Sequence, residues 1–137
     1  MATMLDERIV IANRLDELRR MTQWLHDSAA ALGIAEKALF TLDVCANEAV
    51  TNIISYAFGD RMRHDIALEL HKTGTGACLV IRDHGKPFNP LEAPERDLPK
   101  AIKDAGIGGL GIHLIKHLMT RCNYERVDGV NVLSLEL

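Results

Sequence analysis

The chain has 137 residues, of which 47% are hydrophobic and 26% charged, as in an ordinary globular protein. A chain of this length can bury about two thirds of the surface that its unfolded form exposes, so we expect a single domain over residues 1–137. The net charge of -3 gives no basic footprint for nucleic acid or anionic lipid, and no apolar run approaches the roughly 20 residues of a membrane span. We therefore expect a cytoplasmic protein with neither nucleic acid nor membrane as a partner.

The first part of the chain predicts a strand followed by two helices. A short strand is expected over residues 7–11, and then an amphipathic helix with a capping-type start at Asp16 and an end at Gly33. A second helix is expected over residues 35–56, because apolar residues recur there at helical spacing. Those residues are Leu39, Leu42, Ala46, Ala49, Ile53 and Tyr56.

Two hairpins are predicted in the rest of the chain, one on each side of a long loop. Their strands are expected over residues 65–71 and 77–82, with a turn at 73–76, and over 123–127 and 130–135, with a turn at Asp128 and Gly129. In each hairpin the two strands should pair antiparallel.

The loop between the hairpins covers residues 86–105 and contains all four prolines of the chain. It shows no usable periodicity, which in a domain of this size predicts a functional loop, and we interpret it as a mobile lid. A third helix is expected after it, over residues 110–120.

A carboxylate and a carboxamide lie four residues apart on the second expected helix, at Glu48 and Asn52. They share one helix face, so both side chains can point into one site. The Asn52 oxygen suits Mg²⁺, which usually takes only one or two protein oxygens, and Glu48 could act as a general base. Taken alone, the pair is also typical of a solvated helix face.

Asp83 ends a strand of mainly apolar residues. An unpaired carboxylate there is costly unless a donor meets it, and the amino group of adenine is such a donor. Gly85 lacks a side chain where a flat base would approach the backbone. Taken alone, the segment is equally typical of a turn that follows a strand.

A glycine-rich segment precedes the third expected helix, with glycines at Gly106, Gly108, Gly109 and Gly111. Its backbone N–H groups and the positive end of the helix could hold phosphates. The segment also matches the dinucleotide pattern G-x-G-x-x-G, with Glu125 near the distance of a ribose-binding acid. That fingerprint must follow a strand directly, whereas residues 97–105 are polar and contain proline, so we favour phosphate binding. A glycine-rich linker is the alternative.

Two histidines at helical spacing, His113 and His117, lie on the third expected helix. The residues between them lack the glutamate of a zinc protease motif, and no third ligand is evident. We expect ordinary histidines on a helix surface.

Together and in this order, the three segments resemble those of the GHKL ATPase superfamily, and more closely its small bacterial branch of anti-sigma factor serine/threonine kinases. Residues 48–52 resemble the N box of that superfamily, 83–88 its first glycine box and 106–112 its second. The resemblance covers nearly the whole chain. It implies an α+β fold, the two-layer α/β sandwich of the Bergerat type, with a mixed, mainly antiparallel sheet and helices on one face.

The resemblance also implies roles for individual residues. Glu48 would be the catalytic base, Asn52 the Mg²⁺ ligand and Asp83 the adenine anchor, while Gly85 would shape the base pocket. The second glycine box would supply the other ATP contacts, from Gly106, Gly108, Gly109, Leu110, Gly111 and Ile112.

By the same resemblance the protein would be a homodimeric, ATP-dependent serine/threonine kinase. It would bind a sigma factor in one state and phosphorylate a STAS-domain anti-anti-sigma factor in another. From the length we expect neither the phosphoacceptor-histidine domain of a complete sensor kinase nor the extra domains of the gyrase, chaperone and mismatch-repair branches. An ATP-binding regulator with little or no kinase activity and a nucleotide-independent binding module are the alternatives.

Overall fold

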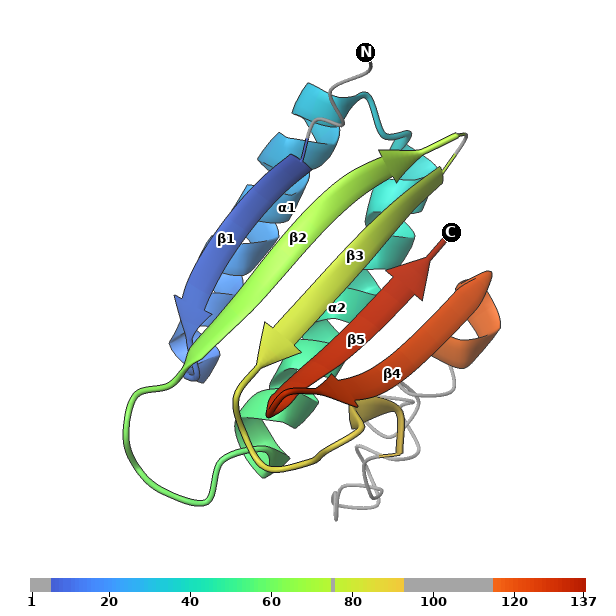
Figure 1. Cartoon of the computed structure of the whole chain (residues 1–137). Coiled ribbons are helices and arrows are strands. Elements are labelled where there is room, and N and C mark those ends of the chain that lie inside the picture. Colours follow the sequence, from blue (N-terminus) through green and yellow to red (C-terminus); the bar gives the residue numbers. More distant parts are fainter. Residues whose placement is uncertain (1–5, 75, 93–114) are drawn as a thin grey trace, which may run out of the picture.

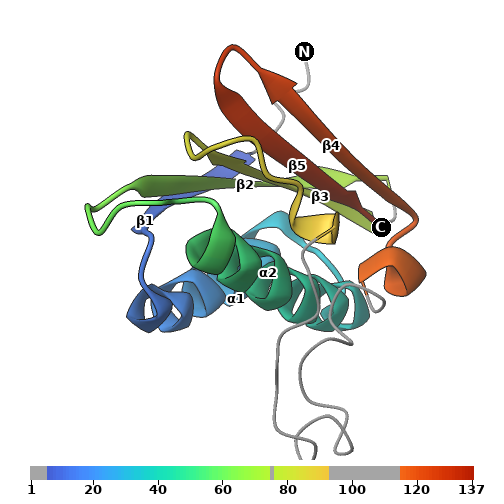
Figure 2. The same cartoon turned by 90° about the horizontal axis from the view of Figure 1, so that it is seen from below.

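The computed structural model describes residues 6–74, 76–92 and 115–137. Two long helices cover one face of a five-stranded sheet (Figures 1 and 2). The elements are β1 (Asp6–Ala12), η1 (Leu15–Glu17), α1 (Leu18–Leu32), α2 (Glu36–Tyr56), β2 (Asp65–Thr73), β3 (Gly76–Asp83), η2 (Pro90–Glu92), β4 (Arg121–Val127) and β5 (Val130–Glu136). The strand order is β1-β2-β3-β5-β4. This confirms the expected two-layer α/β sandwich, and every strand pair in the described ranges is antiparallel.

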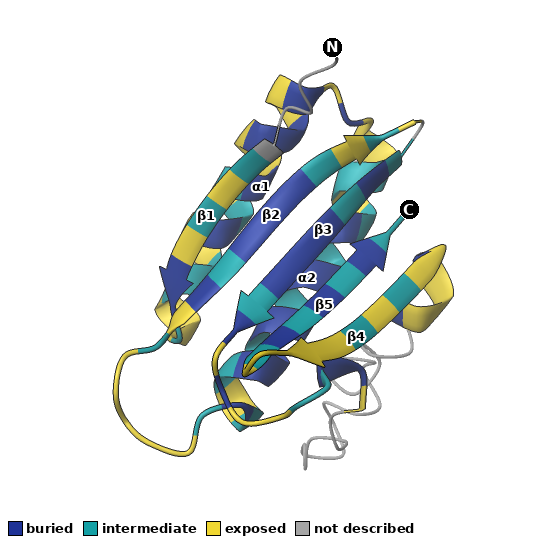
Figure 3. Cartoon of the chain, in the orientation of Figure 1, coloured by how far each residue is buried: buried dark blue, intermediate teal, exposed yellow. Residues whose placement is uncertain are grey.

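The core lies between the sheet and the two helices. Alternate residues of a strand point to the same face, and on β2 the residues that face the helices are Ile66, Leu68 and Leu70, all nearly inaccessible to solvent. On α2, the buried apolar residues recur three or four positions apart and include Leu42, Ala46, Ala49 and Ile53. The expected apolar stripe of this helix is therefore confirmed over its middle. Figure 3 shows the same pattern, with most burial on the central strands and most exposure on β1 and β4.

The face of the sheet opposite α1 and α2 contains a buried carboxylate. Glu69 on β2 is only 9% exposed and pairs with Arg82 on β3 at 2.8 Å and with Arg8 on β1 at 2.7 Å. The hydrogen bond from Arg82 is the largest of the effects that hold the pKa of Glu69 below its ordinary value. The three side chains therefore connect three neighbouring strands across this face.

The two helices begin and end close to the positions expected from the sequence. α2 begins at Glu36, one residue after the expected start, and α1 ends at Gly33, whose positive φ of 73° and N–H bonds to Ala29 O and Ala30 O close the helix. The expected capping start at Asp16 is wrong. Asp16 lies in the turn η1 and accepts a hydrogen bond from Arg14 Nε instead. No helix in the described ranges is both long and apolar enough to span a membrane.

The two hairpins are confirmed, and each strand is slightly longer than expected. Asp128 and Gly129 have φ values of 50° and 80°, the two positive values of a type I′ turn, which matches the twist of the strands beside it. Residues 115–118 form the end of the third expected helix, whose start lies outside the described residues. This helix ends before Thr120, because the Thr120 N–H bonds to Glu136 O at 2.8 Å.

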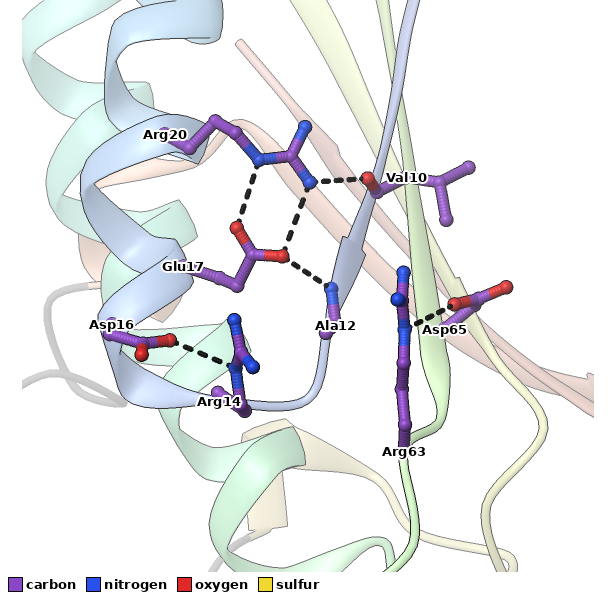
Figure 4. Close-up of polar contacts among 8 residues, drawn as sticks. All are labelled: Val10, Ala12, Arg14, Asp16, Glu17, Arg20, Arg63 and Asp65. Carbon is purple, nitrogen blue, oxygen red and sulfur yellow. Dashed lines mark hydrogen bonds and ion pairs between the residues drawn. The ribbon is translucent and has the colours of Figure 1, made fainter.

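Glu17, the last residue of η1, and Arg20, in the first turn of α1, close part of the free edge of β1 (Figure 4). Arg20 Nη2 donates to Val10 O at 2.8 Å, and Glu17 Oε1 accepts from the Ala12 N–H at 3.0 Å. The two side chains also bond each other, with 2.9 Å between Arg20 Nε and Glu17 Oε2. These backbone groups would otherwise be open to another strand. The bond from Arg20, more than that from Ala12, lowers the pKa of Glu17 from 4.5 to about 2.

Replacing Glu17 with glutamine should lower the thermal midpoint of unfolding at neutral pH. A carboxylate whose pKa is depressed in the folded state stabilises the fold above its unfolded-state pKa and loses this contribution as the pH falls through the folded-state pKa. The difference between wild type and Glu17→Gln should therefore shrink as the pH falls from about 4.5 toward 2. Circular dichroism melts over this pH range measure it.

Glu125→Gln is the matched control, because Glu125 is an exposed β4 residue that makes no ion pair in the described part of the chain. A difference between wild type and Glu17→Gln that stays constant down to the lowest pH would contradict the role of the ionised carboxylate.

Candidate functional site

The C-terminal half of α2 lies against the segment that follows β3. Three contacts join them: Lys86 N–H to Ala57 O at 2.9 Å, Asn52 Nδ2 to Pro90 O at 3.4 Å, and the rings of Tyr56 and Phe88 with centroids 5.7 Å apart. The structure thus brings together two of the three segments that the sequence singles out, although they are far apart along the chain.

Asn52 is 2% exposed and faces the segment after β3. Its Nδ2 donates to Pro90 O, and its Oδ1 is the atom of the amide that has the chemistry of a metal ligand. Glu48 is partly buried and lies one helical turn earlier on α2, so it shares this face of the helix. The predicted juxtaposition of these two side chains therefore agrees with the observed helix.

Asp83 is the last residue of β3 and is only 1% exposed. Its Oδ1 accepts two hydrogen bonds, from the Gly85 N–H at 2.9 Å and from Asn131 Nδ2 at 3.0 Å. Among the described residues, none donates a hydrogen bond to the other oxygen, Oδ2. An ionised carboxylate can accept bonds at both oxygens, so Oδ2 keeps the capacity to accept a donor from a ligand.

Gly85 sits where the backbone after β3 approaches the end of α2. A Cβ at this position would lie 2.5 Å from Ala57 O and 2.9 Å from Asp83 Oδ1. Glycine is therefore required at this position because the backbone packs closely against Ala57 and the Asp83 carboxylate. The reason inferred from the sequence, room for a flat base, stays a prediction.

Asn131 on β5 is a polar residue of this site that the sequence analysis did not single out. It is 2% exposed, and besides Asp83 it contacts the segment after β3 and its own hairpin. Its other hydrogen bonds are with Lys86 O, the Phe88 N–H, the Tyr124 hydroxyl and Arg126 Nη1. The sequence offers one signal, since Asn131 lies in phase with Leu133 and Leu135, which point into the core.

The remaining predicted residues lie outside the described ranges. They are Gly106, Gly108, Gly109, Leu110, Gly111 and Ile112, with His113 and most of the expected lid. His117 is exposed on the helical residues 115–118. The described part of the site therefore consists of Glu48, Asn52, Asp83 and Gly85, with Asn131 added by the structure.

Replacing Gly85 with alanine should destabilise the fold by about 1–3 kcal/mol, the usual cost of inserting a methyl group into a packed region. The reason is the short approach of the new Cβ to Ala57 O. Urea unfolding measures the change in the free energy of unfolding. Gly59→Ala is the control, since a Cβ there meets nothing within 4 Å and should change stability by less than about 0.5 kcal/mol. Equal unfolding midpoints for Gly85→Ala and wild type would contradict the packing role.

Comparison with known proteins identifies the family. Residues 11–137 match the model of the histidine kinase-like ATPase domain. The chain is also 37% identical over 112 residues to the serine/threonine-protein kinase BtrW of Bordetella bronchiseptica, an alignment that covers 82% of this chain and 79% of that protein. The chain therefore belongs to the histidine kinase-like ATPase family of the GHKL superfamily, in agreement with the resemblance of its three segments, and its relative supports the small serine/threonine kinase branch.

Proposed function

We propose that this protein binds ATP with Mg²⁺ and transfers the γ-phosphoryl group to a serine or threonine of a partner protein. The observation that carries the proposal is the Asp83 carboxylate, buried beside Gly85 and held at one oxygen only by the described residues. An acceptor of this kind suits the exocyclic amino group of adenine. The membership of an ATPase family and the likeness to a serine/threonine-protein kinase support the same function.

The residues of α2 fit the chemistry of phosphoryl transfer. A carboxamide oxygen is a hard ligand, and Asn52, whose Nδ2 donates to Pro90 O, carries one on the part of α2 that meets the segment after β3. When bound, Mg²⁺ supplies positive charge that neutralises the charge developing on the phosphate oxygens. Gly106, Gly108, Gly109 and Gly111 would hold the phosphates through their backbone N–H groups.

Glu48 would accept the proton of the attacking hydroxyl. As the hydroxyl oxygen bonds to the γ-phosphorus, the bond from that phosphorus to the bridging oxygen breaks and ADP leaves with the electron pair. The phosphorylated partner and ADP are the products. Glu48 is suited to this role because it lies one turn from Asn52 on the same face of α2.

The partners follow from the resemblance of the three segments. We propose that the phosphoacceptor is a STAS-domain anti-anti-sigma factor, that a sigma factor is the second partner, and that the protein acts in the cytoplasm as a homodimer. Saturable ATP binding, followed by transfer of labelled phosphate to a STAS-domain protein, tests this. Binding without transfer would identify an ATP-binding regulator instead, and no binding would leave a nucleotide-independent module.

Glu48→Gln should keep ATP binding and lose phosphoryl transfer by roughly 10²-fold or more, the usual contribution of a general base. Calorimetry measures the binding, and single-turnover transfer from labelled ATP measures the chemistry. Glu36→Gln, an exposed position at the start of the same helix, is the control and should transfer phosphate at the wild-type rate. Turnover close to wild type in Glu48→Gln would remove Glu48 from the role of base.

Asn52→Ala should reduce the gain in ATP affinity that Mg²⁺ provides, because the variant lacks the proposed ligand oxygen. Titrations of ATP with Mg²⁺ and with a chelator separate this effect from the loss of the bond to Pro90 O, which weakens both equally. Asn123→Ala, at an exposed β4 position, is the control. The same loss of affinity with and without Mg²⁺ would argue against metal ligation by Asn52.

A further inference from the structure

The β4–β5 hairpin reaches the site through one buried amide. Asn131 uses both hydrogens of Nδ2, donating to Asp83 Oδ1 at 3.0 Å and to Lys86 O at 2.8 Å. Both acceptors belong to the end of β3 and the segment after it. The side chain therefore connects β5 with the acid that we propose as the adenine anchor.

Neighbouring donors fix the orientation of this amide. Its Oδ1 accepts from the Tyr124 hydroxyl at 2.6 Å and from Arg126 Nη1 at 3.0 Å. A guanidinium can only donate, so the atom that faces Arg126 must be the amide oxygen. The amide nitrogen is thereby turned toward Asp83, and a flip of the amide would place N–H groups against N–H groups.

Arg126 also holds the backbone beside Asp83. Its Nη1 donates to Gly85 O at 2.9 Å, while the Gly85 N–H donates to Asp83 Oδ1. Gly85 is therefore held by two hydrogen bonds, one to Asp83 at the end of β3 and one from Arg126 on the β4–β5 hairpin. Rotation of the Asp83 carboxylate would break its bonds to Gly85 and Asn131 together.

We infer that Asn131, oriented by Tyr124 and Arg126, is a positioning residue that presents Asp83 Oδ2 to the exocyclic amino group of adenine. The inference rests on the proposed ATP-binding function and gives it a determinant of base specificity. A site that hydrogen-bonds an N–H of its ligand rejects an analogue that lacks this group more strongly than an apolar pocket does. Hypoxanthine, the base of inosine nucleotides, has a carbonyl in place of the adenine amino group.

The experiment compares the affinities of ADP and inosine diphosphate, measured by calorimetry on the full chain. Wild type should favour ADP by about tenfold or more, the scale of a hydrogen bond to a charged group. In Asn131→Asp the side chain still accepts from Tyr124 and Arg126, but its second oxygen faces Asp83 Oδ1 and Lys86 O. The preference for ADP should then fall to less than about threefold. Asn123→Asp, the same change at an exposed β4 position, should keep the wild-type preference.

Arg126→Ala tests the inference in a variant that keeps the buried amide, with Arg121→Ala at an exposed position of the same strand as its control. Arg126→Ala should lower the preference for ADP, whereas Arg121→Ala should not. A folded Asn131→Asp or Arg126→Ala protein that loses affinity for both nucleotides equally would overturn the inference, because a purely structural residue would act in this way. A thermal melt shows whether Asn131→Asp folds. If it does not fold, the preference of Arg126→Ala for ADP over inosine diphosphate tests the inference instead.

The wild-type measurement separates this inference from the proposed function. If wild type binds ADP and inosine diphosphate with equal affinity, Asp83 does not read the amino group and the inference is overturned, while nucleotide binding stands. If wild type binds neither nucleotide, nor ATP with Mg²⁺, the proposed function itself is overturned, and the inference with it.

Discussion

The buried carboxylate of Asp83 imposes the main constraint on this end of the molecule. A charge at the end of an apolar strand is costly unless donors surround it, and Gly85 and Asn131 provide two of them. The bond to Gly85 N–H turns the chain sharply after β3 and directs it onto the end of α2, where Lys86 bonds to Ala57 O. Satisfying one carboxylate thus determines how a strand, a helix and the C-terminal hairpin meet.

Most secondary structure could be predicted from the sequence because its signals are local. Apolar spacing predicts α2, and the Asp128-Gly129 dipeptide predicts the last hairpin, since both depend on residues that are close along the chain. The predicted capping start of α1 at Asp16 is wrong because the start of this helix depends on contacts with strand β1. Glu17 and Arg20 bind the edge of β1, a tertiary contact that replaces a local cap and that the sequence near Asp16 does not reveal.

The site could be predicted only where its residues belong to recognisable segments. Asn52, Asp83 and Gly85 belong to such segments, and the structure brings them together. Asn131 lies 48 residues from Asp83 and reaches it only because β5 is inserted between β3 and β4. Spacing along the chain does not reveal this insertion, so Tyr124, Arg126 and Asn131 could not be assigned to the site beforehand.

The insertion of β5 also has a consequence for the order in which the molecule is assembled. Strands β1, β2 and β3 and both helices are synthesised before residue 84, whereas β5 follows more than 40 residues later. Until β5 emerges from the ribosome, Asp83 lacks its amide partner and β3 is an open edge. An open strand edge can pair with another chain, so the edge of β3 is exposed to such pairing until β5 covers it. The hydrogen bond from Asn131 to Asp83 can therefore form only once the last hairpin has been made.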